Sequence, residues 1–162
     1  MRRNLLSRSA FLALALLAAG CATADPAGVR AANAEGWPDC PVPEILAATD
    51  AYMETFNARN IEAWEATYHF PHVRIASGTV SVLDAPGTRS NDLFDRLAAT
   101  GWDHSGWDKR EVIHCEGDKA HLDTTFVRYR ADGTELARFN SLYVMERKDG
   151  RWGVTARSSF AP

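Results

Sequence analysis

Apolar residues after Pro41 recur at every third or fourth position, which places their side chains on one face of a helix. This stripe consists of Ile45, Thr49, Tyr52 and Phe56. Pro41 suits a helix start, where the first backbone N–H groups have no partner, and Glu44 suits the positive end of the helix. The pattern therefore predicts an amphipathic helix that ends near Arg59.

Two shorter helices and an extended segment follow. Asn60 can cap a helix in which apolar residues again recur at helical spacing. These residues are Ile61, Trp64 and Tyr68. Because Pro71 disfavours helical backbone at the residue before it, we predict an extended segment over residues 72–77. Ser90 or Asn91 can cap a third helix.

The apolar period changes to two in the last third of the chain, beginning near Trp107, which indicates β-strands with one buried face. The predicted strands cover residues 109–116, 119–131, 134–148 and 151–160. Short connectors that contain Asp and Gly join them, as in consecutive hairpins. We therefore predict an α+β fold in which helices cover one face of a curved antiparallel sheet.

The first twenty residues have the pattern of an export signal. Three arginines precede an apolar run over residues 10–19, which is too short for a permanent membrane helix of roughly 20 residues. The run ends in Leu-Ala-Ala-Gly-Cys at Cys21, which resembles the bacterial lipobox. The resemblance implies that Cys21 carries a lipid and anchors a periplasmic or outer-membrane protein. Cleavage after residues 22–24 would instead give a secreted protein, and both Sec and twin-arginine export stay open.

Composition limits the partners of the mature chain. We assign residues 1–20 to the signal, 21–40 to a flexible tether and 41–162 to one folded domain. After the signal, 15 basic and 21 acidic residues remain, a net charge of −6. Nucleic acid is therefore not expected as a partner, because phosphate binding needs a clustered basic surface.

The cysteines leave two possibilities open. Cys40 and Cys115 can form a disulfide in an oxidising compartment or remain as two thiols. No Cys-x-x-Cys or His-x-x-x-His pair is present, so we expect no metal site. No nucleotide-binding glycine pattern is present either, and we expect no cofactor.

Two stretches resemble the nuclear transport factor 2 superfamily, also called SnoaL-like or ketosteroid-isomerase-like. They are AYMETFNARNIEAWEATYHFPHVRIASG at residues 51–78 and DGRWGVTARSSFAP at residues 149–162. The resemblance implies a cone-shaped sheet wrapped around three N-terminal helices, with an internal pocket for a small molecule. It also implies pairing through the outer sheet face, so we expect a homodimer.

This superfamily contains both binding proteins and cofactor-free isomerases, dehydratases and lyases, so the fold alone does not choose between them. Its ketosteroid isomerases carry a catalytic carboxylate on the first strand. The segment 72–77, HVRIAS, has no acidic residue, which argues against steroid isomerase chemistry.

The predicted strand 72–77 has two possible orientations, because alternate side chains of a strand point to opposite faces. We favour the one in which Val73 and Ile75 point inward and His72 and Arg74 point outward. In the alternative, Arg74 binds an anion at the pocket mouth and His72 transfers a proton. We interpret the neighbouring His69 as a capping or solvent-exposed residue.

Aromatic residues and one arginine complete the candidate pocket. Tyr52, Trp64 and Tyr68 fall on the inward helix stripes, which in a cone fold also form the pocket wall. Tyr143 and Arg157 belong to the last strands. A buried arginine needs an anionic partner. We expect an ion pair with Asp123 or Glu146, and a bound ligand is the alternative.

We therefore predict an exported, lipid-anchored domain that binds a small aromatic or anionic molecule. The alternative is a cofactor-independent isomerase, dehydratase or lyase in the same pocket. The candidate pocket residues are Tyr52, Trp64, Tyr68, His72, Arg74, Tyr143 and Arg157. His114 and His121 are expected across from each other on adjacent strands, and neither they nor Asp103 with His104 are predicted to form a site.

Overall fold

A computed structural model describes residues 37, 39–90 and 92–162 of the chain. Its elements are α1 (Val42–Asn57), α2 (Ile61–Glu65), β1 (Tyr68–Ala76), β2 (Thr79–Leu83), α3 (Leu93–Ala99), β3 (His104–Glu116), β4 (Lys119–Tyr129), β5 (Glu135–Lys148) and β6 (Arg151–Ser159). The predicted α+β fold, with helices before a long antiparallel meander, is confirmed. No described helix has both the length and the apolar character needed to cross a membrane.

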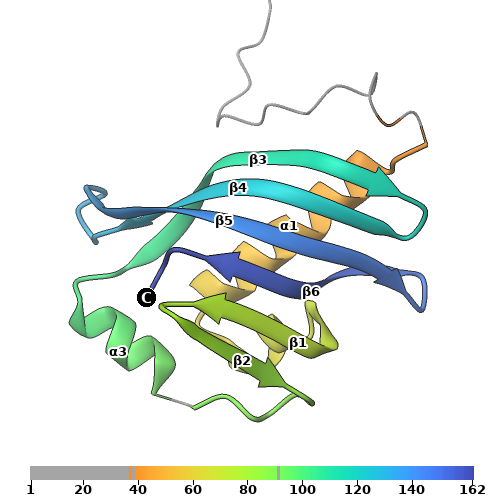
Figure 1. The fold of residues 1–162 in the computed structure, drawn as a ribbon. Coiled ribbons are helices and arrows are strands. Elements are labelled where there is room, and N and C mark those ends of the chain that lie inside the picture. Colours follow the sequence, from red (N-terminus) through yellow and green to blue (C-terminus); the bar gives the residue numbers. More distant parts are fainter. Residues whose placement is uncertain (1–36, 38, 91) are drawn as a thin grey trace, which may run out of the picture.

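The six strands form one curved sheet in the order β2-β1-β6-β5-β4-β3 (Figure 1). Every neighbouring pair is antiparallel except β1 and β6, which run parallel. The four strands of the meander follow one another through hairpins, as the connectors predict. The parallel contact therefore joins the β1–β2 hairpin to the meander and completes the sheet.

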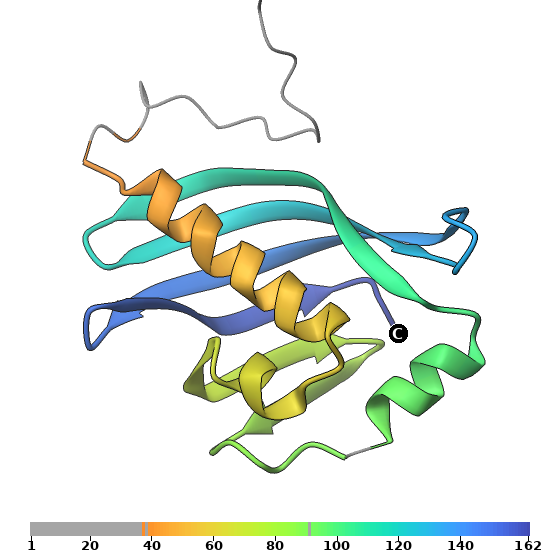
Figure 2. The same ribbon diagram turned by 180° about the vertical axis from the view of Figure 1, so that it is seen from behind.

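Helix α1 crosses the concave face of the sheet (Figure 2). Its buried residues are Ile45, Thr49, Tyr52 and Met53. Ile45 and Tyr52 belong to the main core cluster, and Met53 belongs to a smaller cluster. The main cluster also contains Leu122, Tyr143, Met145 and Val154 of the sheet. Because burial of apolar side chains supplies most of the driving force for folding, this contact fixes the helix on the sheet.

The second helix is shorter than the sequence pattern predicts. The Asn60 side chain caps it by accepting a hydrogen bond from the Ala63 backbone N–H at 2.9 Å, as predicted. The helix ends at Glu65, and Tyr68 opens strand β1, so the assignment of Tyr68 to the helix was wrong. Tyr68 pairs with Val154 of β6, and this tertiary pairing outweighs the local helical spacing.

The sequence pattern did not indicate β2, and the start of β3 lies earlier than predicted. Ser77 and Gly78 both have positive φ angles, 53° and 73°, and form the tight turn between β1 and β2. Strand β3 begins at His104 instead of Lys109. Helix α3 begins after Asp92, although we expected Ser90 or Asn91 as its cap, and Asn91 lies outside the described residues.

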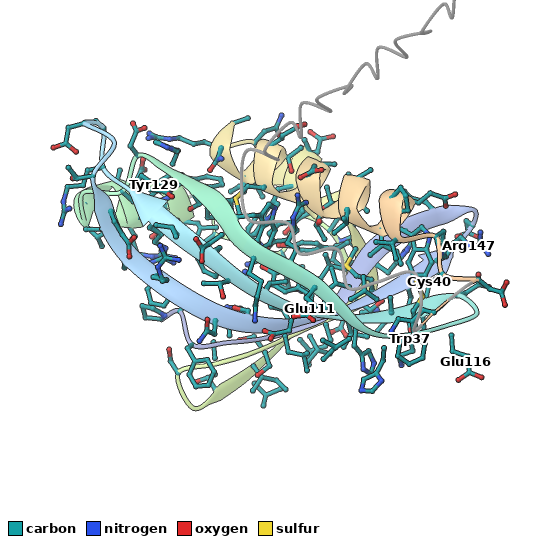
Figure 3. All side chains as sticks on the ribbon, turned by 90° about the horizontal axis from the view of Figure 1, so that it is seen from above. Trp37, Cys40, Glu111, Glu116, Tyr129 and Arg147 are labelled. Carbon is teal, nitrogen blue, oxygen red and sulfur yellow. A yellow bond between two sulfur atoms is a disulfide. The ribbon has the colours of Figure 1, made fainter. Side chains whose placement is uncertain are left out.

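A disulfide joins Cys40 to Cys115, with 5.9 Å between the two Cα atoms. It ties the segment before α1 to the end of β3, as Figure 3 shows beside the labelled Glu116. Trp37 also packs against the core and contacts the ring of His114. The end of the segment predicted as a tether therefore contacts the folded domain. The predicted signal, Cys21 and most of the tether lie outside the described residues.

Candidate functional site

A cavity of about 560 Å³ lies between the concave face of the sheet, the helices α1 and α3, and the end of the chain. One part of its wall is apolar. This part consists of Met53, Phe56, Trp64, Leu83, Leu93, Leu97 and Phe126. The volume falls in the range of small-molecule sites, and such sites combine an apolar wall with a few polar groups.

The polar part of the wall is dominated by arginine. The arginines that line the cavity are Arg74, Arg89, Arg96, Arg128 and Arg157. None of the lining residues within the described ranges is aspartate or glutamate. The interior therefore carries an excess of positive charge, although the chain as a whole is acidic.

Arg157 of β6 lies at the centre of this wall. Its Nη1 donates hydrogen bonds to the hydroxyl oxygens of Tyr52, at 2.8 Å, and Tyr143, at 3.3 Å. Its Nε is buried and has no hydrogen-bond partner in the described part of the chain. A guanidinium has five N–H donors, so this arrangement leaves donor capacity for a ligand.

The predicted ion pair of Arg157 with Asp123 or Glu146 was wrong. Asp123 pairs with Lys109, and Glu146 pairs with Lys119 and Lys148. Both carboxylates lie on strand positions that face away from the cavity lining. Arg157 is instead contacted by neutral hydroxyl groups, which accept hydrogen bonds without cancelling its charge.

Tyr143 remains a neutral hydroxyl at any physiological pH. Burial raises its pKa far above the usual value, and the neighbouring Tyr52 raises it further, while Arg157 acts in the opposite direction. A hydroxyl that accepts a hydrogen bond from Arg157 keeps its own proton to donate. Tyr143 can therefore present an O–H donor beside the guanidinium.

Arg74 and Arg128 also face the cavity without an aspartate or glutamate partner among the described residues. Arg74 Nη2 donates to the carbonyl oxygens of Ala161 and Pro162, each at 3.1 Å. The Nε of Arg128 is buried without a partner, and its guanidinium lies 5.0 Å from the ring centre of Phe139. Burial lowers the pKa of both arginines, and the positive charge of Arg157 lowers both further.

The other two arginines have acidic partners. Arg89 lies 3.6 Å from the Glu65 carboxylate, donates to the Tyr68 hydroxyl at 3.2 Å and covers the ring of Trp64. Buried Glu65 also accepts a 2.6 Å hydrogen bond from the Gly87 backbone N–H, which fixes the loop between β2 and α3. Arg96 pairs with Asp92.

Strand β1 presents His72 and Arg74 to the inside of the cone. His72 is buried and Arg74 lines the cavity, whereas Ile75 is 47% exposed on the outer face. The orientation that we favoured, with Val73 and Ile75 inward, was therefore wrong. Arg74 pairs with Arg157 in the sheet, so both side chains project from the same face.

His72 lies behind the cavity wall and does not line it. Its ring stacks on Tyr68 with 4.0 Å between ring centres, and its Nδ1 donates to the Val154 carbonyl at 3.1 Å. Burial lowers its pKa to about 4, although the hydrogen bond to Val154 acts in the opposite direction. His69 is also buried instead of exposed, with its Nε2 3.1 Å from the Arg151 carbonyl.

Most of the predicted pocket residues meet at one cavity. Its lining includes Tyr52, Trp64, Arg74, Tyr143 and Arg157. Tyr68 and His72 support this lining from behind. Sequence reasoning missed Arg89, Arg96 and Arg128. Arg128 could have been found, because it lies two positions from Phe126 on β4 and therefore on the same sheet face.

A family model described as NTF2-like protein (DUF6841) matches residues 43–160. This chain is a member of the NTF2-like family. The predicted superfamily membership is therefore confirmed. A comparison with curated proteins gives no match.

Solved structures share the NTF2-like fold at low sequence identity. An NTF2-like protein of unknown function from Shewanella oneidensis is 14% identical, with a TM-score of 0.60 over 74% of this chain and 98% of that chain. An NTF2-like protein with a cystatin-like fold from Novosphingobium aromaticivorans is 18% identical, with a TM-score of 0.60 over 74% and 80%. A ketosteroid isomerase-like protein from Erwinia carotovora atroseptica is 22% identical, with a TM-score of 0.50 over 74% and 96%.

The remaining histidines lie outside the NTF2-like cavity. His104 Nδ1 hydrogen-bonds the Asp103 carboxylate at 2.9 Å, but both side chains are largely solvent-exposed. His114 and His121 are paired across β3 and β4, as predicted, with 5.9 Å between ring centres. Residues 37, 39–90 and 92–162 contain no cluster of three or more metal-binding side chains.

The buried His72 predicts a loss of stability in acid. Below pH 6.5 the unfolded chain protonates this histidine, whereas the folded chain resists protonation until about pH 4. Its contribution is therefore fully present above pH 6.5 and is lost as the pH falls toward 4, up to about 3 kcal/mol. We expect urea unfolding to show a smaller loss between pH 7 and pH 4.5 in His72→Gln than in the wild type.

The matched control is His104→Gln, which removes an exposed histidine. An unchanged pH dependence in His72→Gln would contradict the assignment.

Proposed function

We propose that the domain binds a small organic anion with an aromatic or apolar part inside the cone. The observation that carries the proposal is an arginine-lined cavity whose lining has no aspartate or glutamate among the described residues. Partly buried charges normally have partners of opposite sign, because desolvation of an unpaired ion is unfavourable. An anionic ligand would provide that partner.

The donors around Arg157 suit an oxyanion. The guanidinium fork can bind a carboxylate with two parallel hydrogen bonds, and the hydroxyls of Tyr52 and Tyr143 lie beside it. The apolar wall, which includes Trp64 and Phe126, would contact a ring or a hydrocarbon part. Polar anchoring at one side and apolar contact at the other support an anion with an aromatic part.

The choice between binding and catalysis depends on a proton acceptor. Within the described part of the chain, the cavity lining includes no aspartate, glutamate or histidine side chain, which favours binding. The alternative is a cofactor-independent isomerase, dehydratase or lyase. The hydrogen-bond donors of Arg157, Tyr52 and Tyr143 support this alternative, because they could stabilise an anion that develops on a substrate.

We further propose that the domain is exported and held at a bacterial membrane by a lipid on Cys21. The lipobox-like sequence before Cys21 supports this. The Cys40–Cys115 disulfide supports export independently, because disulfides persist in oxidising compartments outside the cytosol.

We also propose that two copies pair through the outer face of the sheet. The exposed apolar residues of this face are Ile75, Val80, Val82 and Leu142. Ile75 pairs directly with Val80, so neighbouring strands present them side by side. Contiguous apolar groups on an exposed sheet face are typical of contact surfaces, and a second copy would cover them symmetrically.

The binding proposal predicts a preference for a charged aromatic ring. We expect benzoate to bind at least about tenfold more tightly than neutral benzamide, the factor expected for one charge-assisted hydrogen-bonded contact. Arg157→Gln should remove this difference, whereas Arg130→Gln, outside the cavity lining, should retain it. Tryptophan fluorescence can report binding, because Trp64 lines the cavity.

Native mass spectrometry should reveal any compound that copurifies with the protein, and NMR should show it unchanged after incubation. Conversion of the compound would favour the enzymatic alternative. Equal binding of benzoate and benzamide would contradict the proposal.

The anchoring proposal predicts that Cys21→Ala moves the protein from the membrane fraction to the soluble fraction of its host cell. The reason is that cysteine is the lipid-carrying residue of a lipobox. Immunoblots of fractionated cells measure this, with Cys115→Ala as the control cysteine variant. Membrane retention of Cys21→Ala would contradict lipid anchoring.

The pairing proposal predicts that Ile75→Glu converts a dimer into a monomer, because a charge would be buried against the second copy. Analytical ultracentrifugation should give twice the monomer mass for the wild type. Thr79→Glu introduces a charge at an exposed residue of the same hairpin as a control. A monomeric wild type would refute pairing.

A further inference from the structure

The arginines that line the cavity fall into two groups, those with an acidic side chain as partner and those without one. Arg89 pairs with Glu65, and Arg96 pairs with Asp92. The remaining lining arginines are Arg74, Arg128 and Arg157. No aspartate or glutamate of the described residues lies within ion-pair distance of any of them. Arg74 is held at the main-chain oxygens of Ala161 and Pro162, the last two residues of the sequence. Arg128 and Arg157 are therefore the lining arginines that have no anionic group beside them in the described part of the chain.

These three charges lie close enough to act on one another. Arg74 and Arg157 occupy paired positions of the parallel strands β1 and β6, about 4.8 Å apart in a regular sheet. Their side chains project from the same face into the same cavity. Arg128 reaches the cavity from β4 and feels the charges of both Arg74 and Arg157. The sheet therefore places the positive charges of these three arginines close together on one face.

The neutral partners of Arg128 and Arg157 leave their charges intact. Arg157 donates to tyrosine hydroxyls, and Arg128 lies over an aromatic ring. Such contacts orient a guanidinium but contribute no negative charge. In addition, the Nε atoms of Arg128 and Arg157 are buried without partners. A ligand with one negative charge would compensate only one of these two arginines and leave the other uncompensated.

We propose that the ligand of this cavity is an organic dianion, which compensates Arg157 together with Arg128. The inference rests on the proposed function and specifies the charge of its ligand. Two chemistries provide two charges: a pair of separate carboxylates, or one phosphate monoester, which is close to doubly ionised above pH 7. Both offer oxygen acceptors that match the guanidinium fork.

The test compares four probes that share one aromatic ring and differ in charge: benzamide, benzoate, isophthalate and phenyl phosphate. Isothermal titration calorimetry at pH 7.5 measures their affinities for the full-length protein. We expect isophthalate or phenyl phosphate to bind at least about tenfold more tightly than benzoate, the factor expected for one additional charge-assisted contact. The tighter of the two dianions identifies whether the charges lie on separate groups or on one.

Variants assign the second charge to a residue. Arg128→Gln should weaken binding of the dianion more than binding of benzoate, so that the preference for the dianion over benzoate falls to near unity. The matched control is Arg130→Gln, which removes an exposed positive charge near the end of β4 and outside the cavity lining. We expect this control to keep the full preference.

The melting temperature of the ligand-free variants distinguishes an arginine that binds the ligand from one with a purely structural role. Removal of one of three repelling charges should leave the melting temperature of Arg128→Gln equal to or above that of the wild type. A lower melting temperature together with equal loss of benzoate and dianion binding would indicate a structural role and overturn the inference.

The remaining outcomes separate this inference from the proposed function. If benzoate binds as tightly as both dianions, the dianion is excluded while anion binding stands. If Arg128→Gln keeps the preference for the dianion, the charge assignment is overturned. If none of the three anions binds, the proposed function fails and the inference fails with it.

Discussion

The interaction on which the site depends is the contact of Arg157 with the hydroxyls of Tyr52 and Tyr143. It joins α1, β5 and β6 at the centre of the concave face, where a carboxylate would have been the usual partner of an arginine. Because both partners are neutral, the guanidinium is held in place and keeps its charge. The same contact therefore organises the core and leaves the cavity electropositive.

The surrounding scaffold keeps this charged cavity open. Helix α1 covers one part of the concave face, and the disulfide from Cys40 to Cys115 holds the segment before α1 against the end of β3. At the other side, buried Glu65 binds both Gly87 and Arg89 and fixes the loop that leads into α3. These contacts restrain the walls, so that the space between them does not have to be filled by side chains.

Membership in the NTF2-like family does not by itself select a ligand. In this chain the residues that line the cavity determine which kind of ligand it favours. An apolar wall beside arginines, in a lining whose described residues include no aspartate or glutamate, favours an anion with an aromatic or apolar part. The crowding of Arg74, Arg128 and Arg157 adds a second constraint, because like charges in a partly buried space are unfavourable until a ligand compensates them.

The sequence by itself determined the α+β class, the stripe of α1, the cap at Asn60 and the hairpins of the meander, because each depends on residues close together in the chain. It did not determine the end of α2, strand β2 or the orientation of β1. Tyr68 has helical spacing to Trp64, but its pairing with Val154 places it in a strand. Likewise, His72 and Arg74 alternate with Val73 and Ile75, so either set could have faced inward. Only the tertiary structure decided this, because the inward face of a strand depends on the distant strand and helix that it packs against.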